Sequence, residues 1–427
     1  CILAQLDEHG KITQEKIIAG GKEESIFQPQ WSPDNQFYFV SDRSNWWNIY
    51  RWDGTAAEIV CTLDADFATP QWVFGMSTYG FLNAQEIFCC YSQQGFWQAS
   101  IIDISKRKLQ KLATEFRDIS AVHCHNNRAW FLAASATQGA QLWRYSDNKI
   151  VTVTNNTTTV TQNYIARAEA IEFPTRDGES AHGFFYRPTN PDISPAPDSL
   201  PPLLVMCHGG PTGATETGLN LKIQYWTSRG FAVLDVNYRG STGYGRQYRD
   251  RLKHNWGITD VIDACSGVDY LIAQGLVDKN KIAIRGSSAG GYTVLAALTF
   301  SDVFKAGASL YGIGDLEALA KDTHKFEAHY LDSLVGAYPQ QQAIYRARSP
   351  IHHVEQLHCP VIFLQGLQDK VVPPAQAEAM VNALTAKGIY TEYVTFTEEA
   401  HGFRQAQSIQ RALEAELAFY QKVFGEI

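Results

Sequence analysis

The chain has 427 residues, and a typical domain has about 150, so the length favours two or more domains over a single small one. Hydrophobic residues make up 45% of the sequence and charged residues 19%, which excludes a largely disordered chain. The net charge is −8 and no block of lysine or arginine residues occurs, so the composition favours neither a nucleic-acid partner nor a membrane-surface helix.

Three further absences from the sequence narrow the class of protein. No apolar run approaches the roughly 18 residues of a membrane span, so we expect no membrane partner. The eight cysteines are scattered, and Cys89 and Cys90 are adjacent, unlike a disulfide framework, so we expect a cytoplasmic protein. The clusters at 123–125 and 358–359 contain histidine and cysteine but no four-ligand set. We therefore expect no metal and no other cofactor.

The first part of the chain, residues 1–165, has the pattern of short strands separated by polar turns. A Pro-Gln-Trp sequence occurs at 29–31 and again at 70–72. Strands with aromatic residues recur at intervals of about 40 to 50 residues, at 47–50, 97–100 and 142–145. Such a period is typical of propeller blades, because one four-stranded blade cannot bury both of its faces alone. An irregular β-sandwich is the alternative.

The length of this first part also suggests that the propeller is partial. Only three to four blades of the observed period fit into residues 1–165, too few to close a ring. The first residue is Cys1 rather than methionine, and no charged-then-apolar leader follows it. We therefore expect further chain upstream of Cys1.

The second part, residues 166–427, alternates solid apolar runs with amphipathic stretches. Apolar residues at helical spacing predict a helix that begins at Thr259 and Asp260 and stops at Gly275. Runs typical of strands buried on both faces occur at 203–207, 231–236, 282–284 and 361–364. Alternating strands and helices predict a doubly wound, mostly parallel sheet, the architecture of an α/β-hydrolase.

A Gly-x-Ser-x-Gly sequence follows the run at 282–284 and centres on Ser288. A serine on a sharp strand-to-helix turn needs small neighbours two residues before and after it, and Gly286 and Gly290 supply them. The rival Ser287 has Arg285 and Ala289 at those positions, so Ser288 is the better candidate nucleophile. The following helix N-terminus would stabilise nearby negative charge.

A serine nucleophile needs a histidine base held by a carboxylate, in the order serine, acid, histidine along such a chain. Asp369 follows the run at 361–364 and is therefore expected at the carboxyl edge of the sheet, where ligands bind. His401 is the histidine that follows the last predicted strand, 392–396. We predict that Ser288, Asp369 and His401 form a catalytic triad, with Glu398 and Glu399 as solvated neighbours.

Two glycine-rich turns are candidates for further roles at the site. The amide of Ala289 and one amide of the loop 207–211 are expected to donate hydrogen bonds to the oxyanion of the reaction. His208 lies in that loop, and we expect it to be structural. In the turn 237–245, Tyr238 and Arg239 are candidates for substrate binding, with a purely structural turn as the alternative. This turn lacks the Gly-Lys-Ser/Thr of a phosphate loop.

Together these motifs resemble the prolyl oligopeptidase family of serine peptidases, in particular its acylaminoacyl-peptidase and dipeptidyl-aminopeptidase-like branch. The first part of the chain matches only through its Pro-x-Trp-Ser-Pro-Asp and Ser-Asp-Arg units. The second part matches through DG at 177–178, HG at 182–183, HGGP at 208–211, NYRGSTGYG at 237–245, GSSAGGY at 286–292, SPI at 349–351, GLQDKVVPP at 366–374 and HGF at 401–403.

The resemblance implies an activity and a set of residues. It implies Ser288 as nucleophile, Asp369 as orienting acid, His401 as base, and Gly210 with Ala289 as oxyanion donors. It also implies cleavage of short peptides, with a propeller that excludes folded proteins, and it leaves a homo-oligomer open. Many relatives place an arginine or asparagine two residues after the acid to hold a substrate carbonyl, whereas this chain has Val371 there.

Two other functions remain open at the level of the sequence. A carboxylesterase or amidase that acts on small non-peptide acyl compounds would use the same serine chemistry. A propeller interaction module with an inactive hydrolase is a third hypothesis, although all three chemical positions are intact. The choice between exopeptidase and endopeptidase also stays open.

Overall fold

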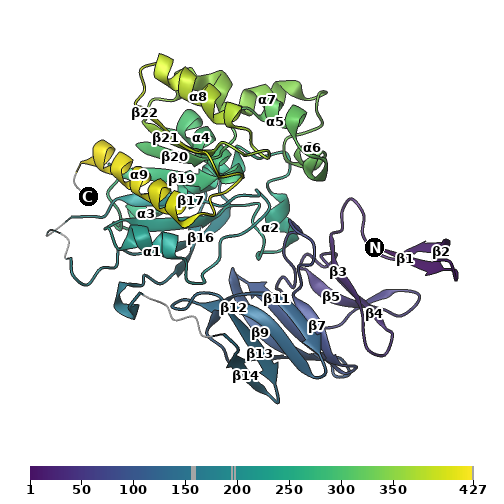
Figure 1. Cartoon of the computed structure of the whole chain (residues 1–427). Coiled ribbons are helices and arrows are strands. Elements are labelled where there is room, and N and C mark those ends of the chain that lie inside the picture. Colours follow the sequence, from purple (N-terminus) through teal and green to yellow (C-terminus); the bar gives the residue numbers. More distant parts are fainter. Residues whose placement is uncertain (155–159, 194–195, 197–198, 426–427) are drawn as a thin grey trace. The chain divides into compact units, whose positions relative to one another are not determined.

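The computed structural model describes residues 1–154, 160–193, 196 and 199–425, and it divides into two compact units (Figure 1). Unit 1 consists of Cys1–Thr161 together with two short later segments, Glu216–Asn220 and Thr242–Arg249. The remainder of the chain forms unit 2, namely Gln162–Thr215, Leu221–Ser241 and Asp250–Ile427. The sequence pattern divides the chain near residue 165 and does not predict that these two later segments belong to unit 1.

Unit 1 contains a hairpin and three four-stranded antiparallel sheets, each with its strands in chain order. The hairpin pairs β1 (Ile2–Leu6) with β2 (Ile12–Ile17). The first sheet comprises β3 (Ile26–Trp31), β4 (Phe37–Ser41), β5 (Asn48–Trp52) and β6 (Ala57–Ile59). The second comprises β7 (Tyr79–Asn83), β8 (Glu86–Gln93), β9 (Phe96–Asp103) and β10 (Lys108–Lys111). The third comprises β11 (Phe116–His125), β12 (Arg128–Ser135), β13 (Gln141–Ser146) and β14 (Lys149–Thr152).

Aromatic side chains join neighbouring sheets of unit 1. Tyr38 of the first sheet packs edge-on against Phe81 of the second, with ring centroids 4.9 Å apart. Phe88 of the second sheet stacks on Phe131 of the third at 5.0 Å. Each four-stranded sheet thus buries a face against the next one, as propeller blades do. The predicted β-propeller blades are confirmed, and the recurrent aromatic strands of the sequence belong to these sheets.

The two later segments of the chain are bonded into unit 1. The amide of Leu219 donates to the carbonyl of Ser135, 2.8 Å away. The amide of Gly243 donates to the buried carboxylate of Asp66 at 2.9 Å. Backbone amides of both segments therefore contribute to holding them in unit 1.

Unit 2 is built on one eight-stranded sheet in the order β15-β16-β18-β17-β19-β20-β21-β22. The edge strand β15 (Glu169–Pro174) and the next strand, β16 (Ser180–Tyr186), are antiparallel to their neighbours. The parallel strands are β17 (Leu203–Cys207), β18 (Ala232–Asn237), β19 (Ile282–Ser287), β20 (Ala306–Leu310), β21 (Val361–Gly366) and β22 (Thr391–Phe396). This mostly parallel sheet confirms the predicted α/β-hydrolase fold.

Helices cover both faces of this sheet (Figure 1). Ile284 of β19 belongs to the core shared with the helices α3 and α4, whereas the next residue, Arg285, faces Glu416 of α9. The longer helices are α3 (Thr259–Ala273), α4 (Ala289–Phe300), α8 (Pro374–Ala386) and α9 (Ala406–Phe424). The shorter ones are α1 (Leu221–Thr227), α5 (Leu316–Asp322), α6 (Tyr330–Leu334) and α7 (Gln342–Arg348), with 3₁₀ turns η1 (Gln162–Tyr164), η2 (Lys325–Glu327) and η3 (Pro350–Gln356). The helix α2 (Arg246–Asp250) lies almost entirely in the later segment that belongs to unit 1.

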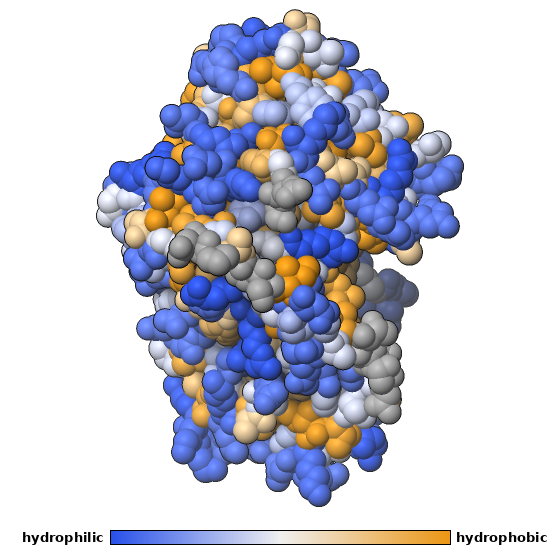
Figure 2. All heavy atoms as spheres, turned by 90° about the vertical axis from the view of Figure 1, so that its left-hand side faces the viewer, coloured by the Kyte–Doolittle hydropathy of each residue, from blue (hydrophilic) through white to orange (hydrophobic). Residues whose placement is uncertain are grey.

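The central strands of unit 2 are buried, and one face of the molecule is mostly hydrophilic (Figure 2). The parallel strands β17, β18 and β21 are buried along their whole length, which explains their solid apolar runs. On the face drawn in Figure 2, hydrophilic side chains predominate and hydrophobic ones lie between them in small groups. Among the described residues, no helix combines the length and the apolar character needed to cross a membrane.

Candidate active site

Ser288 lies on a sharp turn between β19 and α4. Its backbone has φ 55° and ψ −121°, a conformation that few residues with side chains adopt. A Cβ added at Gly286 would lie 2.3 Å from the carbonyl oxygen of Gly290, and one added at Gly290 would lie 2.1 Å from that of Cys207. Neither distance is sterically allowed, so both positions flanking Ser288 require glycine.

Asp369 and His401 come from the loops that follow β21 and β22. The Asp369 side chain is buried, and its Oδ1 accepts hydrogen bonds from the amides of Val371 and Val372, each at 2.9 Å. Its Oδ2 lies 2.7 Å from Nδ1 of His401. These three bonds fix the carboxylate and, through it, the orientation of the imidazole ring.

The imidazole of His401 links the carboxylate to the serine. Its Nε2 lies 2.9 Å from Oγ of Ser288. Because the Asp369 carboxylate accepts a hydrogen bond from Nδ1–H, Nε2 carries the lone pair and can accept a hydrogen bond from the serine hydroxyl. The ring of Tyr311 packs edge-on against the imidazole at 4.9 Å and limits its movement. The structure thus brings together all three side chains that the sequence predicts for the triad.

The glycine-rich loop after β17 lies against the nucleophile. A Cβ added at Gly209 would lie 3.3 Å from the carbonyl oxygen of Ser287 and 3.7 Å from Cβ of Ser288. Gly210, the next residue, has φ +122°, which favours glycine. Ala289 is the first residue of α4. The two predicted oxyanion donors therefore belong to segments that lie beside Ser288.

His208 supports this loop from inside the protein. Its ring stacks on that of Tyr238 with centroids 4.2 Å apart, Nδ1–H donates to the carbonyl of Gly209 at 2.9 Å, and Nε2 accepts from the hydroxyl of Ser241 at 2.8 Å. Burial lowers the pKa of His208 to about 4, so the ring is neutral near pH 7. These contacts agree with the expectation that His208 is structural.

The two candidate substrate-binding residues of the turn 237–245 are both buried. The Tyr238 hydroxyl donates to the carbonyl of Pro211 at 3.1 Å. The guanidinium of Arg239 bonds to Asp263 at 2.7 Å and to Asp177 at 2.9 Å. Burial raises the pKa of Asp263 to about 6, although Arg239 opposes that shift. We interpret Tyr238 and Arg239 as supports of the site, in line with the structural alternative.

The structure contradicts the prediction that Glu399 is a solvated neighbour of His401. The side chain is buried rather than solvated, and its carboxylate accepts hydrogen bonds from the amides of Arg404 at 3.0 Å and Gln405 at 2.9 Å. Burial alone would raise the pKa of Glu399, but the two amides outweigh it and the pKa is lowered. Glu399 therefore anchors the segment that follows His401. This role could not be predicted, because the polar neighbours of Glu399 in the sequence suggested a solvated side chain.

Two polar pairs of unit 2, each with a buried carboxylate, were not predicted from the sequence. Arg285 and Glu416 form an ion pair with 2.8 Å between Nε and Oε1, directly before the turn of Ser288. The hydroxyl of Thr215 donates to Asp235, whose pKa is raised to about 6 by burial. Asp235 and Arg285 are charged residues inside otherwise apolar strands. This pattern in the sequence would have indicated that each of them has a polar partner in the fold.

The His-Cys clusters of the sequence belong to different units of the chain. His123, Cys124 and His125 lie on β11 in unit 1, and Nδ1 of His358 contacts Nζ of Lys387 at 3.4 Å. Within the part of the chain that the structure describes, no group of three or more His, Cys, Asp or Glu side chains gathers as metal ligands would.

Comparison with protein families and curated proteins agrees with the motifs. Residues 217–426 match the model described as the prolyl oligopeptidase family. The dipeptidyl aminopeptidase BIII of Pseudoxanthomonas mexicana is 28% identical over 301 residues, which are 66% of this chain and 43% of that protein. The acylamino-acid-releasing enzyme 1 of Oryza sativa subsp. japonica is 29% identical over 217 residues, 48% of this chain and 28% of that enzyme.

Solved structures give a more extensive match. A crystal structure of puromycin hydrolase superposes on 99% of this chain with a TM-score of 0.96 and 36% sequence identity. A puromycin-hydrolyzing peptidase of Mycobacterium tuberculosis matches 100% of the chain with the same TM-score and identity. This chain covers 65% of each of those two chains and less than half of the two curated relatives. The predicted resemblance to the prolyl oligopeptidase family is confirmed.

Proposed function

Because residues 217–426 match the model of the prolyl oligopeptidase family, we propose that this chain carries the catalytic centre of a serine peptidase that hydrolyses short peptides. The observation that carries the proposal is the continuous hydrogen-bonded series from Asp369 through His401 to Ser288, with distances of 2.7 and 2.9 Å. Nucleophile, base and orienting carboxylate are then all in place before a substrate binds.

The reaction proceeds by acyl transfer. His401 Nε2 takes the hydroxyl proton of Ser288 as Oγ attacks the scissile carbonyl, and Asp369 stabilises the imidazolium that results. The amides of Gly210 and Ala289 donate to the oxyanion. His401 then protonates the leaving amine, the C–N bond breaks, and an ester on Ser288 remains. Water, activated by the same histidine, hydrolyses this ester and restores the serine hydroxyl.

The substrates are small acyl amides. Solved structures similar to this chain are named for puromycin hydrolysis, and puromycin is an aminoacyl amide. Puromycin and short peptides with a free or acylated amino terminus are therefore the first substrates to test. We further propose that the propeller domain restricts access, so that casein and other long chains are poor substrates.

We place the peptidase in the cytoplasm. All eight cysteine thiols, which lie within the described residues, are free, as a reducing compartment would keep them. Burial raises the pKa of the Cys207 thiol well above its ordinary value, so this cysteine next to the oxyanion loop stays a thiol.

The deciding experiment compares the wild-type chain with Ser288→Ala on p-nitrophenyl esters, puromycin, and short peptide amides with free and acetylated amino termini. We expect peptide-amide hydrolysis in the wild type and a loss of about a thousandfold or more in kcat for Ser288→Ala, with an unchanged circular dichroism spectrum. Ester hydrolysis without peptide hydrolysis would contradict the peptidase and favour the carboxylesterase hypothesis. Near wild-type turnover of Ser288→Ala would contradict the mechanism.

A further inference from the structure

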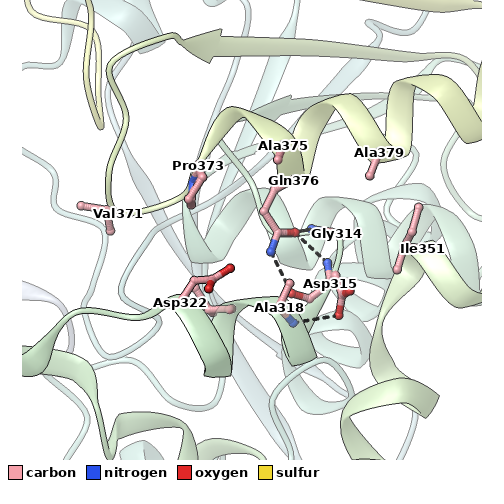
Figure 3. A pocket seen from close by; sticks show the side chains of 11 residues that line it. Gly314, Asp315, Ala318, Asp322, Ile351, Val371, Pro373, Ala375, Gln376 and Ala379 are labelled. Carbon is pink, nitrogen blue, oxygen red and sulfur yellow. Dashed lines mark hydrogen bonds between the residues drawn. The ribbon is translucent and has the colours of Figure 1, made fainter.

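A pocket of about 130 Å³ lies within unit 2, between α5 and the start of α8 (Figure 3). Its size is close to that of a cavity that holds one benzene ring, so it accommodates a single amino-acid side chain. Figure 3 shows Val371 and Pro373 toward one side of the pocket and Ile351 and Ala379 toward the other. No step of the proposed mechanism uses this space.

The pocket adjoins the proposed catalytic centre. Its wall includes Val371, whose amide donates to the Oδ1 of Asp369 at 2.9 Å. Its opposite wall begins at Gly314, shortly after Gly312, and a Cβ added at Gly291 in the helix of the nucleophile would lie 2.6 Å from Cα of Gly312. Both walls thus follow the carboxyl ends of β20 and β21, the edge at which such sheets bind their ligands.

Hydrogen bonds hold the two walls in place. The amide oxygen of Gln376 on α8 accepts from the backbone amides of Gly314 at 3.0 Å and Asp315 at 2.9 Å. The amide nitrogen of Gln376 donates to the carbonyl of Asp315 at 2.9 Å. These three bonds, drawn in Figure 3, connect α8 to the start of α5, so the pocket is formed before any ligand enters.

The lining combines apolar walls with negative charge. Asp315 and Asp322 are its two charged residues, and none of the lining residues, all of which the structure describes, is basic. The nearby Lys321 is occupied elsewhere, since its ammonium pairs with Glu317 at 2.8 Å. The apolar lining residues are Ala318, Leu319, Ile351, Val371, Pro373, Ala375 and Ala379.

We propose that this pocket binds a lysine or arginine side chain of the substrate. The aliphatic stem of such a side chain packs against the apolar walls, and its cationic end pairs with Asp315 and Asp322. This inference rests on the proposed peptidase function and adds to it a preference for basic residues next to the scissile bond.

The test compares kcat/KM for short peptide amides that carry lysine, norleucine, glutamate or alanine at either position flanking the scissile bond. Norleucine has the stem of lysine without the charge. We expect the wild type to prefer lysine over norleucine at one position by about fivefold or more, and to reject glutamate there. The double variant D315N/D322N should bring the lysine-to-norleucine ratio close to one. Asparagine also caps helices well, so α5 keeps its N-cap in this variant.

A second variant and two matched controls test the position of the pocket. Ala379→Leu fills the pocket and should lower kcat/KM for lysine and norleucine substrates together, while the alanine substrate stays within about twofold. Glu378→Gln removes a charge from the same helix outside the pocket lining, and Ala386→Leu adds the same bulk at an exposed position near its end. Both controls should keep the wild-type ratios.

The outcomes separate this inference from the proposed function. Hydrolysis of the panel with an unchanged lysine-to-norleucine ratio in D315N/D322N, or an equal change in Glu378→Gln, would overturn the basic-side-chain pocket and leave the peptidase intact. If the wild type hydrolyses no member of the panel and a fluorophosphonate fails to label it, the peptidase function fails, and the inference falls with it.

Discussion

Backbone geometry at single residues determines whether Ser288 is presented to a substrate. Ser288 has a positive φ, and the atoms around Gly286 and Gly290 leave no space for a Cβ. The need for glycine on both sides of Ser288 can be recognised from the sequence, because the Gly-x-Ser-x-Gly pattern at 286–290 contains both glycines. The role of His208 is visible only in part: its place in a glycine-rich loop suggests support, but the stacking on Tyr238 depends on residues 30 positions apart.

Gly290→Ala should disable the site. The added methyl group would lie 2.1 Å from the carbonyl oxygen of Cys207, so the turn must shift and Ser288 with it. We expect a loss of at least about a hundredfold in kcat/KM together with a lower melting temperature. Gly139→Ala is the control, because nothing lies within 4 Å of its added Cβ. Wild-type activity in Gly290→Ala would contradict the steric argument.

The neutral state of His208 predicts a pH dependence of stability. The pKa of His208 in the folded chain is about 4, below its ordinary value of 6.5, because burial disfavours the charged ring. The stability that this difference contributes is fully present above pH 6.5 and is lost as the pH falls through 4. His208→Gln, which cannot titrate, should therefore show a smaller fall in unfolding free energy between about pH 7 and about pH 4.5. Urea denaturation at both pH values measures this fall. An equal fall in the wild type and in His208→Gln would contradict the proposal that His208 is neutral in the folded chain.

At the scale of elements, the site depends on the loops at the carboxyl ends of the parallel strands. The loops after β17, β19, β21 and β22 supply the oxyanion loop, Ser288, Asp369 and His401 respectively. The apolar runs of the sequence predict these strands because burial on both faces leaves a strong signal. The polar contacts beneath the loops are hidden from the sequence, since Glu399 and Arg239 have polar neighbours in the chain and find their partners only in the fold.

Asp235 on β18 gives the second pH prediction, with the opposite sign. Burial raises its pKa to about 6 from 3.8, so the folded chain binds a proton more tightly than the unfolded chain. This contribution to stability is therefore lost as the pH rises from about 4 to about 6. Asp235→Asn keeps an oxygen that accepts from Thr215 and should be more stable than the wild type by about 1 to 3 kcal/mol at pH 7, but not at pH 4.

Thermal unfolding of Asp235→Asn across this pH range checks the prediction. Asp302→Asn, at an exposed aspartate of the same unit, is the control and should leave stability nearly unchanged at both pH values. An Asp235→Asn protein that is less stable than the wild type at pH 7 would show that the carboxylate is favourable there, contrary to this prediction.

At the scale of the whole molecule, the two compact units are not two consecutive pieces of chain. Segments 216–220 and 242–249 leave the hydrolase sequence and belong to unit 1. Arg249 pairs with Asp42 there, and its guanidinium lies 4.3 Å from the ring centroid of Trp47. The composition of the sequence changes near residue 165 and marks the main division, but contacts between distant segments leave no local pattern, so these two insertions could not be predicted.

Residues 162–427 expressed alone should therefore be less stable than the full chain. The fragment would expose the backbone amide of Gly243 and the side chain of Arg249, whose partners Asp66 and Asp42 lie outside it. We expect a lower melting temperature and a greater tendency to aggregate, measured by differential scanning fluorimetry and light scattering at equal concentrations. A fragment that melts at the temperature of the full chain would show that the inserted segments do not contribute to stability.

The most direct measurement is to identify the residue that a fluorophosphonate modifies in the native chain. After labelling, proteolysis and mass spectrometry, the adduct is predicted on Oγ of Ser288, and His401→Ala should abolish it at short reaction times because the hydroxyl is no longer activated. An adduct on another serine, or labelling at the wild-type rate without His401, would contradict the proposal that Ser288, His401 and Asp369 act as one nucleophilic unit.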